Sequence, residues 1–243
     1  MSALAAPFYQ KGRSAIDRQG NCGLWFCETD EWITFATHSN KERKMKKNLG
    51  FLGVLVLLIW GCNSEVTREA DQLFNEGKYQ EAIDSYTEYL TTKPKDIKSI
   101  YNRGRAYEEL GKVEQAKTDF VKVLDLDAEN LNANMSMGKY WYNRKDYNRA
   151  INFFDKVIVI DGRVSDAYLF KGRSFHQQGE FEEAIKSYNL AIDFDKKNAD
   201  AFLYRGALKV AMNQKRGACN DLTRAKALGS DEANSAFNKH CKK

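Results

Sequence analysis

The sequence is poor in residues that interrupt helices and in residues that build metal or catalytic sites. Only two prolines occur among its 243 residues, which favours an all-helical fold. The three histidines, His38, His176 and His240, have neither the spacing of a metal pair nor that of a catalytic set. A Gly-rich phosphate loop, a nucleophile elbow and a paired acid motif are also missing. We therefore expect no enzyme, no metal and no cofactor.

An excess of charge of one sign is missing too. The whole chain has 38 Lys and Arg against 33 Asp and Glu, a net charge of +5. From Cys62 onwards, 30 basic and 28 acidic residues leave a net charge of only +2. Because proteins that bind nucleic acid usually carry a strongly basic face, this balance predicts no nucleic-acid partner.

The apolar run near residue 50 is short. Lys46 and Lys47 follow Met45, and residues 49–60 (LGFLGVLVLLIW) then supply about a dozen apolar positions, enough for an export signal and too few to cross a bilayer. A short buried helix and an uncleaved anchor are the alternatives. Export signals act near the start of a chain, so we expect translation to begin at Met45. Residues 1–44 would then be an upstream or disordered extension.

Residues 58–62 (LIWGC) resemble a bacterial lipoprotein box, although Trp60 is larger than the residue usual at its place. The resemblance implies a signal peptide at 45–61, a lipidated Cys62 and a short tether at 62–64. Two or three acyl chains would hold the protein on a membrane essentially permanently. Asn63, where an aspartate would favour retention in the inner membrane, implies the periplasmic face of the outer membrane.

Small residues recur at intervals of 34 residues, which indicates a repeat array. Counted from residue 63, the units are 63–96, 97–130, 131–164, 165–198 and 199–232. The eighth place holds Ala70, Gly104, Gly138, Gly172 and Gly206, and the twentieth holds Ala82, Ala116, Ala150, Ala184 and Ala218. We expect two helices per unit, which approach each other at these places without a bulky side chain between them.

Large apolar residues recur on the same interval. The eleventh place holds Leu73, Tyr107, Trp141 and Phe175, and the twenty-fourth holds Tyr86, Phe120, Phe154, Tyr188 and Leu222. Both series lie three or four residues from the small places, so each helix should have one buried stripe. Turns are expected around Gly77, Gly111 and Gly179, and around Lys145 in the third unit.

Runs such as Gly104-Arg-Ala-Tyr107 and Phe181-Glu-Glu-Ala184-Ile-Lys-Ser-Tyr188 resemble the tetratricopeptide repeat (TPR) over residues 63–232. Of the prolines expected near the unit ends, only Pro94 is present. The resemblance implies an all-α, right-handed α-solenoid of five helix hairpins at 65–230. A capping helix at 231–243 would cover the apolar end of the array.

In this family, the second, fifth, ninth, twelfth and thirteenth places of the first helix line a groove. The ninth place holds a row of cations, Arg105, Lys139 and Arg173. The neighbouring groove places hold Tyr101, Met135, Leu169, Leu203, Tyr142, His176, Asn143 and Gln177. Such a groove suits a peptide with acidic groups or a free carboxylate. The alternative is a solvated face whose cations balance local acids, as Arg105 could with Glu109.

Two further expectations concern the chain's partners and its cysteines. Chaperone adaptors of this family use a lysine and asparagine clamp, which is absent because Tyr101 and Arg105 occupy the corresponding places. Cys219 and Cys241 should pair in an oxidising compartment, or else remain buried thiols.

The resemblances imply a membrane-tethered scaffold that binds a protein or peptide partner in a bacterial envelope assembly. A glycan-binding or cell-wall-binding component and a regulatory subunit of an envelope enzyme are the alternatives. The oligomeric state stays open.

Overall fold

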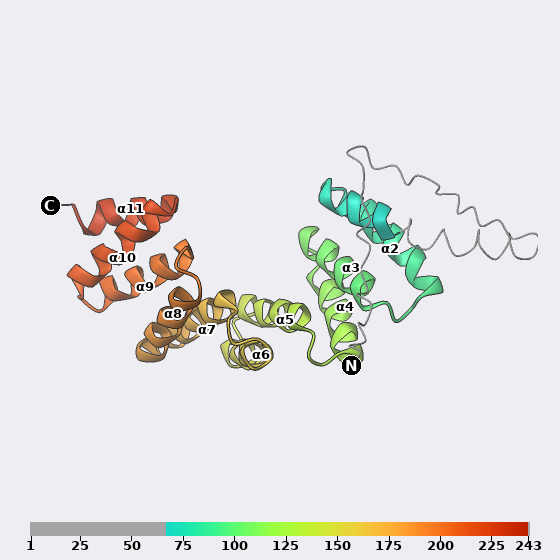
Figure 1. Ribbon diagram of the computed structural model, residues 1–243, viewed down its shortest axis with the longest axis horizontal. Coiled ribbons are helices and arrows are strands. Elements are labelled where there is room, and N and C mark those ends of the chain that lie inside the picture. Colours follow the sequence, from blue (N-terminus) through green and yellow to red (C-terminus); the bar gives the residue numbers. More distant parts are fainter. Residues whose placement is uncertain (1–66, 243) are drawn as a thin grey trace, which may run out of the picture. The chain divides into compact units, whose positions relative to one another are not determined.

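The computed structural model describes residues 67–242, all of them in helices or in the turns between helices (Figure 1). The expected N-terminal extension, signal peptide and lipidated Cys62 lie outside the described residues. Within residues 67–242, no helix is long and apolar enough to cross a membrane.

The helices form consecutive antiparallel hairpins. Residues 67–75 are helical and precede α2 (Tyr79–Thr92). The later hairpins pair α3 (Ile97–Glu109) with α4 (Val113–Leu126), α5 (Leu131–Asn143) with α6 (Tyr147–Ile160), α7 (Ser165–Gln178) with α8 (Phe181–Phe194), and α9 (Ala199–Ala211) with α10 (Lys215–Ala227). The last helix is α11 (Asp231–His240). In the described residues, the fold is therefore the expected all-α, right-handed solenoid of five hairpins and one capping helix.

Three of the first helices begin with a side-chain cap at the last place of the preceding unit. The carboxylate of Asp96 accepts a hydrogen bond from the backbone N–H of Ser99 at 2.8 Å. Asn130 and Asn198 cap α5 and α9 in the same way. Because a capping oxygen satisfies an otherwise unpaired amide of the first turn, these residues start a helix where most units lack the expected proline.

The turn within each hairpin needs one residue with a left-handed backbone. Gly77, Gly111 and Gly179 supply it, with φ of 76°, 69° and 81°. At the same place in the third and fifth units, Lys145 and Asn213 adopt φ of 60° and 58°. Glycine reaches this region without a steric penalty and lysine does not, so the third hairpin keeps its turn at a cost in stability.

The core of each hairpin is a contact between its eighth and twenty-fourth places. A Cβ atom added at Gly138 would lie 2.4 Å from Cε1 of Phe154, and one at Gly172 would lie 2.8 Å from Tyr188. Both rings are fully buried. The expectation that no bulky side chain lies between the helices was therefore wrong, because each small residue makes room for a large one.

The eleventh-place residues are less buried than expected. All four are only partly covered, whereas the twenty-fourth-place residues are at most 1% exposed. The guanidinium of Arg149 covers the ring of Trp141 with its Cζ 3.3 Å from the ring centre. The eleventh place therefore lies at the edge of the core, within reach of polar side chains.

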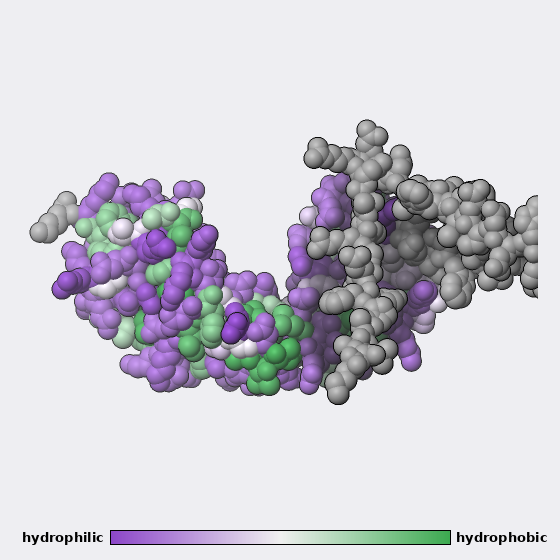
Figure 2. Space-filling model, in the orientation of Figure 1, coloured by the Kyte–Doolittle hydropathy of each residue, from purple (hydrophilic) through white to green (hydrophobic). Residues whose placement is uncertain are grey.

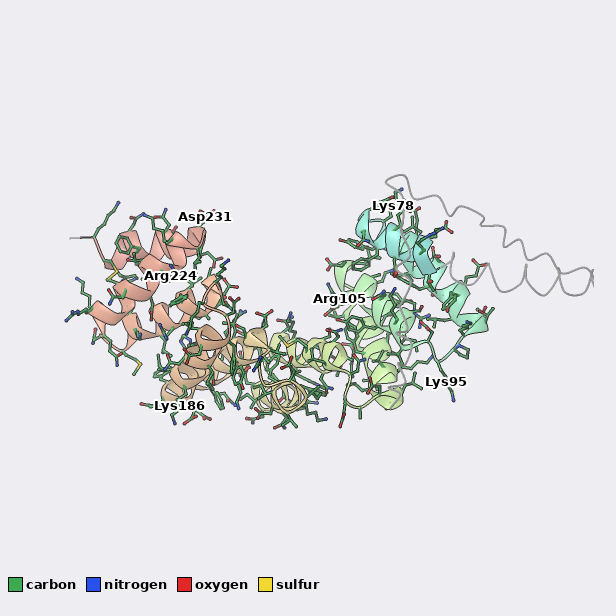
Figure 3. All side chains as sticks on the ribbon, in the orientation of Figure 1. Lys78, Lys95, Arg105, Lys186, Arg224 and Asp231 are labelled. Carbon is green, nitrogen blue, oxygen red and sulfur yellow. A yellow bond between two sulfur atoms is a disulfide. The ribbon has the colours of Figure 1, made fainter. Side chains whose placement is uncertain are left out.

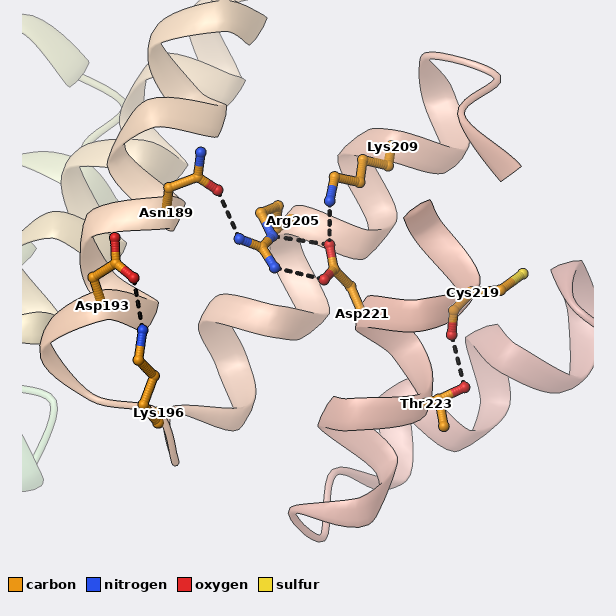
Figure 4. Close-up of polar contacts among 8 residues, drawn as sticks. All are labelled: Asn189, Asp193, Lys196, Arg205, Lys209, Cys219, Asp221 and Thr223. Carbon is orange, nitrogen blue, oxygen red and sulfur yellow. Dashed lines mark hydrogen bonds and ion pairs between the residues drawn. The ribbon is translucent and has the colours of Figure 1, made fainter. Parts of the chain in front are cut away.

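Polar side chains tie most hairpins to the preceding one. Arg205 of α9 donates two hydrogen bonds to Asp221 of α10 and one to Asn189 of α8 (Figure 4). The second unit is joined to the first in the same way, because Arg103 contacts Asp119 of its own hairpin and Thr87 of the preceding one. Between the third and fourth units, Lys171 pairs with Asp155 at 2.6 Å. We call these reach-back contacts polar ties; they join the seventh place of one unit to the twenty-fifth place of the unit before.

The junction between the second and third units has apolar residues at both of these places. Met137 occupies the seventh place and is 3% exposed, and Val121 occupies the twenty-fifth place. Met137 packs with Ala116, Phe120 and Tyr140 instead. Core packing and the surface contacts of Glu114 with α5 and its C-terminal turn hold this junction.

The C-terminal helix α11 closes the array. Phe237 and Ala236 pack on Leu203 and Leu222, so α11 covers apolar side chains of α9 and α10 that would otherwise face water. A disulfide joins Cys219 of α10 to Cys241 at the end of α11, with Cα atoms 5.6 Å apart. The last hairpin is thus capped both by packing and by a covalent bond.

Candidate functional site

The row of cations lies on the first helices α3, α5 and α7, one helix per unit. Arg105, Lys139 and Arg173 are each partly exposed. Besides contacting its hairpin partner, α7 also contacts α5 on one side and α9 on the other. Side chains of α5, α7 and α9 can therefore form one continuous surface.

Arg105 has its charge balanced within its own helix. Its guanidinium lies 3.3 Å from the carboxylate of Glu108 and 3.6 Å from that of Glu109 (Figure 3 shows Arg105 on α3). Burial raises the pKa of Glu108, although Arg105 and Lys139 lower it in part. This arrangement corresponds to the solvated-face alternative, in which the cation is matched by local acids.

Lys139 has a different environment. Its ammonium lies 5.0 Å from the ring centre of Phe170 on the neighbouring first helix α7. Among the described carboxylates, none lies within ion-pair distance of Lys139. The nearby charge of Lys139 only lowers the pKa of Glu108 in part. The positive charge of Lys139 is therefore directed at an aromatic face and is not cancelled by a salt bridge.

Arg173 lies inside a cage of three aromatic rings. Its Cζ is 4.4 Å from the ring centre of Tyr204 and 4.9 Å from those of Tyr142 and Phe170. Its Nε is buried and has no hydrogen-bond partner within the described part of the chain. Because Nε is covered, a ligand reaches Arg173 through the partly exposed remainder of its guanidinium.

The cage is held in place by the core beneath it. The ring of Phe170 lies 5.7 Å from that of the buried Phe154 and meets the ring of Tyr142 edge to face at 5.9 Å. Tyr204 stacks on the buried Tyr188 with ring centres 6.4 Å apart. Because both supporting rings are fixed in hairpin cores, the cage needs little ordering when a ligand binds.

We name the surface formed by Lys139, Tyr142, Phe170, Arg173 and Tyr204 the cation–aromatic face. Sequence reasoning placed Lys139, Tyr142 and Arg173 on it and missed Phe170 and Tyr204. Both occupy the sixth place, which is aromatic only in the fourth and fifth units. The sequence signal for these two residues was the change to an aromatic side chain at the sixth place. This place lies three residues, or about one helical turn, before the ninth-place cation.

The fifth-place leucines do not belong to this face. Leu169 was expected in the groove, but it is 3% exposed and packs in a core cluster with Tyr188 and Leu208. Leu203 is 7% exposed and packs beneath α11. In the fourth and fifth units, the fifth place points under the following element, so these two leucines cannot contact a partner.

The other expected groove residues are divided. Tyr101 is partly buried, its ring 5.6 Å from that of Phe120, while Met135 is partly exposed on α5. Asn143 and Gln177 are exposed at helix ends. His176 turns into its own hairpin, where its Nδ1 lies 3.5 Å from the Tyr188 hydroxyl and burial lowers its pKa.

A hollow lies beside the turn between α5 and α6. It measures about 530 Å³ and is lined by Arg144, Arg149 and Gln178 among others. Its arginines are engaged, because Arg144 pairs with Glu114 and Arg149 pairs with Asp146. This hollow therefore has less free charge to offer a ligand than the cation–aromatic face.

The surface as a whole is polar. Figure 2 shows hydrophilic residues over most of the visible face of the described part, with hydrophobic residues gathered over α6. On α6, Val159 is 86% exposed and Ile160 is 36% exposed. These residues lie on a second helix, apart from the first helices that carry the cation–aromatic face.

Comparison with known families agrees with the observed hairpins. A family model described as tetratricopeptide repeat matches residues 97–130, and another described as TPR repeat matches residues 172–213. The first range covers α3 and α4, and the second covers the C-terminal half of α7 and all of α8 and α9. This chain is a tetratricopeptide repeat protein.

Curated relatives match only short stretches of the chain. The outer dynein arm-docking complex subunit 4 of Danio rerio is 44% identical over 48 residues, which are 20% of this chain and 10% of the relative. The Hsp70-Hsp90 organizing protein 1 of Glycine max is 34% identical over 61 residues, 25% of this chain and 11% of the relative. The chain thus spans about a tenth of the length of these curated relatives.

Solved structures match over a larger share of the chain. MamA from Desulfovibrio magneticus RS-1, from residue 41 to its end, gives a TM-score of 0.63 at 22% identity and covers 69% of this chain and 95% of MamA. PilW, described as a widely conserved type IV pilus biogenesis factor, gives 0.62 at 20% identity and covers 68% and 77%. At these identities the likeness concerns the fold alone.

Proposed function

We propose that this protein is a noncatalytic, membrane-tethered scaffold that binds a protein partner in a bacterial envelope assembly. The observation that carries the binding part is the cation–aromatic face, where Lys139 and Arg173 are partly exposed, contact aromatic rings and form no ion pair with a described carboxylate. Tetratricopeptide repeats commonly form protein-binding surfaces, which agrees with such a role.

The composition of this face favours a protein ligand. Aromatic rings and arginine are enriched where proteins bind one another, because they bury a large area and still offer polar contacts. Here three rings and two cations come from three successive first helices, α5, α7 and α9. A partner that contacts all of them must be extended enough to cross three helices, as a peptide segment is.

The tether rests on residues outside the described part of the chain. A short apolar run after Lys46 and Lys47 and the Gly61-Cys62 pair support an exported lipoprotein. The likeness to PilW adds a reason to place the scaffold in an envelope assembly, as the description of PilW concerns pilus biogenesis. A tethered array would present its face to partners close to the membrane surface.

The binding role is tested by crosslinking intact cells and capturing the protein from the envelope. We compare the wild type with the R105A/K139A/R173A variant and with a control variant, K122A/K186A/K197A, whose lysines lie on second helices or in a turn. We expect partner proteins that the wild type and the control capture and the first variant loses. Unchanged capture by the first variant would show that the face does not bind the partner.

The tether is tested separately with the variant Cys62→Ser. We expect the wild type to incorporate labelled palmitate and to fractionate with outer membranes, and the variant to do neither. Sedimentation of the purified protein with isolated cell wall, in the absence of other proteins, would favour the glycan-binding alternative instead.

A further inference from the structure

We infer that the partner segment is an extended peptide with two acidic side chains separated by one residue, one for Arg173 and one for Lys139. This inference rests on the proposed protein-binding role and specifies the chemistry of the ligand. It concerns internal acidic residues of the partner and does not require a free C-terminal carboxylate.

Arg173 makes no ion pair within the described part of the chain. Arg205, at a different place of the next unit, donates three hydrogen bonds to Asp221 and Asn189, whereas Arg173 has ring contacts and a buried Nε without an acceptor. Ring contacts stabilise the charge but accept no hydrogen bond through Nε. A carboxylate that approaches the terminal nitrogens, which are not covered as Nε is, supplies the counter-charge that the described part of the chain does not.

The kind of anion follows from the guanidinium of Arg173. Its two terminal nitrogens present parallel N–H groups, which match the two oxygens of one planar carboxylate. Three aromatic rings lie 4.4 to 4.9 Å from its Cζ and reduce the exposure of the charge, which strengthens a charge-assisted bond. Burial raises the pKa of Tyr204, with Arg173 lowering it in part, so its hydroxyl remains a neutral donor next to the anion.

The positions of the two cations set the spacing between the two acids. Lys139 Nζ and Arg173 Cζ both lie close to the centre of one ring, that of Phe170, at 5.0 Å and 4.9 Å. The two cations are therefore at most about 10 Å apart. In an extended chain, side chains two residues apart lie on one face at about 7 Å, within the reach of two carboxylates. A single chain-terminal carboxylate would leave one of the two cations without a partner.

Carboxylates at both ends of the cation–aromatic face limit the length of the acidic segment. Glu108 lies near Lys139 at one end of the face, and Asp200 and Glu232 lie near enough to Tyr204 to raise its pKa at the other end. These carboxylates repel further acids on either side of the central pair. The face therefore selects a short acidic motif and disfavours a long polyanion.

The inference is tested with the full-length protein and fluorescent nine-residue peptides that have blocked ends. One peptide carries a central Glu-Leu-Glu and another carries Gln-Leu-Gln. A third has no acidic side chain and a free C-terminal carboxylate. We expect the Glu-Leu-Glu peptide to bind at least about tenfold more tightly than the other two, as expected for charge-assisted bonds, and to weaken with added salt.

Variants of the protein assign the two contacts. Arg173→Lys keeps the charge but removes the planar pair of N–H donors, so we expect it to lose most of the binding, and Lys139→Gln should remove the advantage of the second glutamate. Arg105→Gln is the matched control, because Arg105 is already paired with Glu108 and Glu109. Thermal unfolding of each variant shows whether it is folded.

Two results would overturn the inference. One is equal binding of the Gln-Leu-Gln peptide or of the free carboxylate peptide. The other is an equal loss of binding in Arg105→Gln and Arg173→Lys. If the crosslinked partner is still lost in R105A/K139A/R173A while either result is obtained, the proposed scaffold role stands and only the acidic chemistry of the ligand is wrong.

Discussion

Arg205 and Asp221 form a bidentate, nearly buried ion pair across the last hairpin, with Nε and Nη2 of the arginine 2.9 Å and 2.6 Å from the two carboxylate oxygens. Lys209 adds a third contact to the same carboxylate at 2.8 Å. Only 6% of the Asp221 side chain and 16% of the Arg205 side chain are exposed. Two cations therefore depend on one buried acid.

We expect Asp221→Asn to be strongly destabilising, because it leaves both cations without their counter-charge. Removing one partner of a buried pair typically costs about 3 to 5 kcal/mol of unfolding free energy. The control is Glu183→Gln, whose pair with Lys186 is largely exposed and should change stability by less than about 1 kcal/mol. Urea unfolding measures both, and similar losses in the two variants would contradict the assigned role of Asp221.

The glycine at the eighth place should not tolerate a methyl group. In Gly138→Ala the new Cβ would meet the ring of Phe154 at 2.4 Å, and such overpacking costs about 1 to 3 kcal/mol. Gly162→Ala is a matched control, because the nearest atom to its new Cβ is a backbone oxygen at 3.6 Å. Unfolding curves should separate the two variants, and a neutral Gly138→Ala would show that the hairpin can relax.

At the hairpin turns, introducing a glycine and removing one should change stability in opposite directions. Lys145 has a left-handed backbone, so Lys145→Gly should stabilise the protein by about 1 kcal/mol. Gly111→Ala imposes the same strain on the preceding hairpin and should destabilise it by a similar amount, although no atom lies within 4 Å of the added Cβ. Thermal melting tests the pair, and changes of the same sign would exclude backbone strain as the cause.

The disulfide between Cys219 and Cys241 should contribute mainly to the last hairpin. Closing a loop of 22 residues stabilises a chain by about 3 kcal/mol on the chain-entropy model. We expect Cys241→Ser to lower the unfolding free energy by about that amount and to raise amide exchange in α11 first. Amide exchange that rises equally in α3 and α11 would show that the bond acts on the whole array.

His176 predicts a pH dependence. Burial lowers its pKa in the folded protein, so the unfolded chain binds the proton more readily. The contribution of His176 to stability is therefore fully present above about pH 6.5 and is lost as the pH falls below that value. Urea unfolding at pH 8 and pH 5 should show a smaller acid-induced loss in His176→Gln than in the wild type. Identical losses would mean that other groups cause the effect.

The 34-residue period was sufficient to predict the hairpins, because each small residue has to recur wherever two helices touch. The capping helix was expected for another reason, since the last hairpin would otherwise leave an apolar face in water. Spacing alone did not separate Arg105 from Arg173, which occupy the same place in two units. Their difference depends on neighbours, since Glu108 and Glu109 lie beside one and aromatic rings of α5 and α9 surround the other. Contacts between units decide such details, and a period describes only what the units share.

Leu169 illustrates the same limit. It stands at a groove place by repeat counting, but the following hairpin covers it. Tyr204 illustrates the reverse, because it completes the cage around Arg173 from a place that repeat counting does not assign to the groove. Both depend on how far one hairpin overlaps the next.

The polar ties also have a mechanical consequence. Arg103, Lys171 and Arg205 each fasten a hairpin to its predecessor, whereas the junction between α4 and α5 has Val121 and Met137 at the corresponding places. Core packing and the contacts of Glu114 with Tyr140 and Arg144 hold this junction instead. The cation–aromatic face lies wholly on α5, α7 and α9, so a movement at this junction would leave its residues together on the C-terminal block.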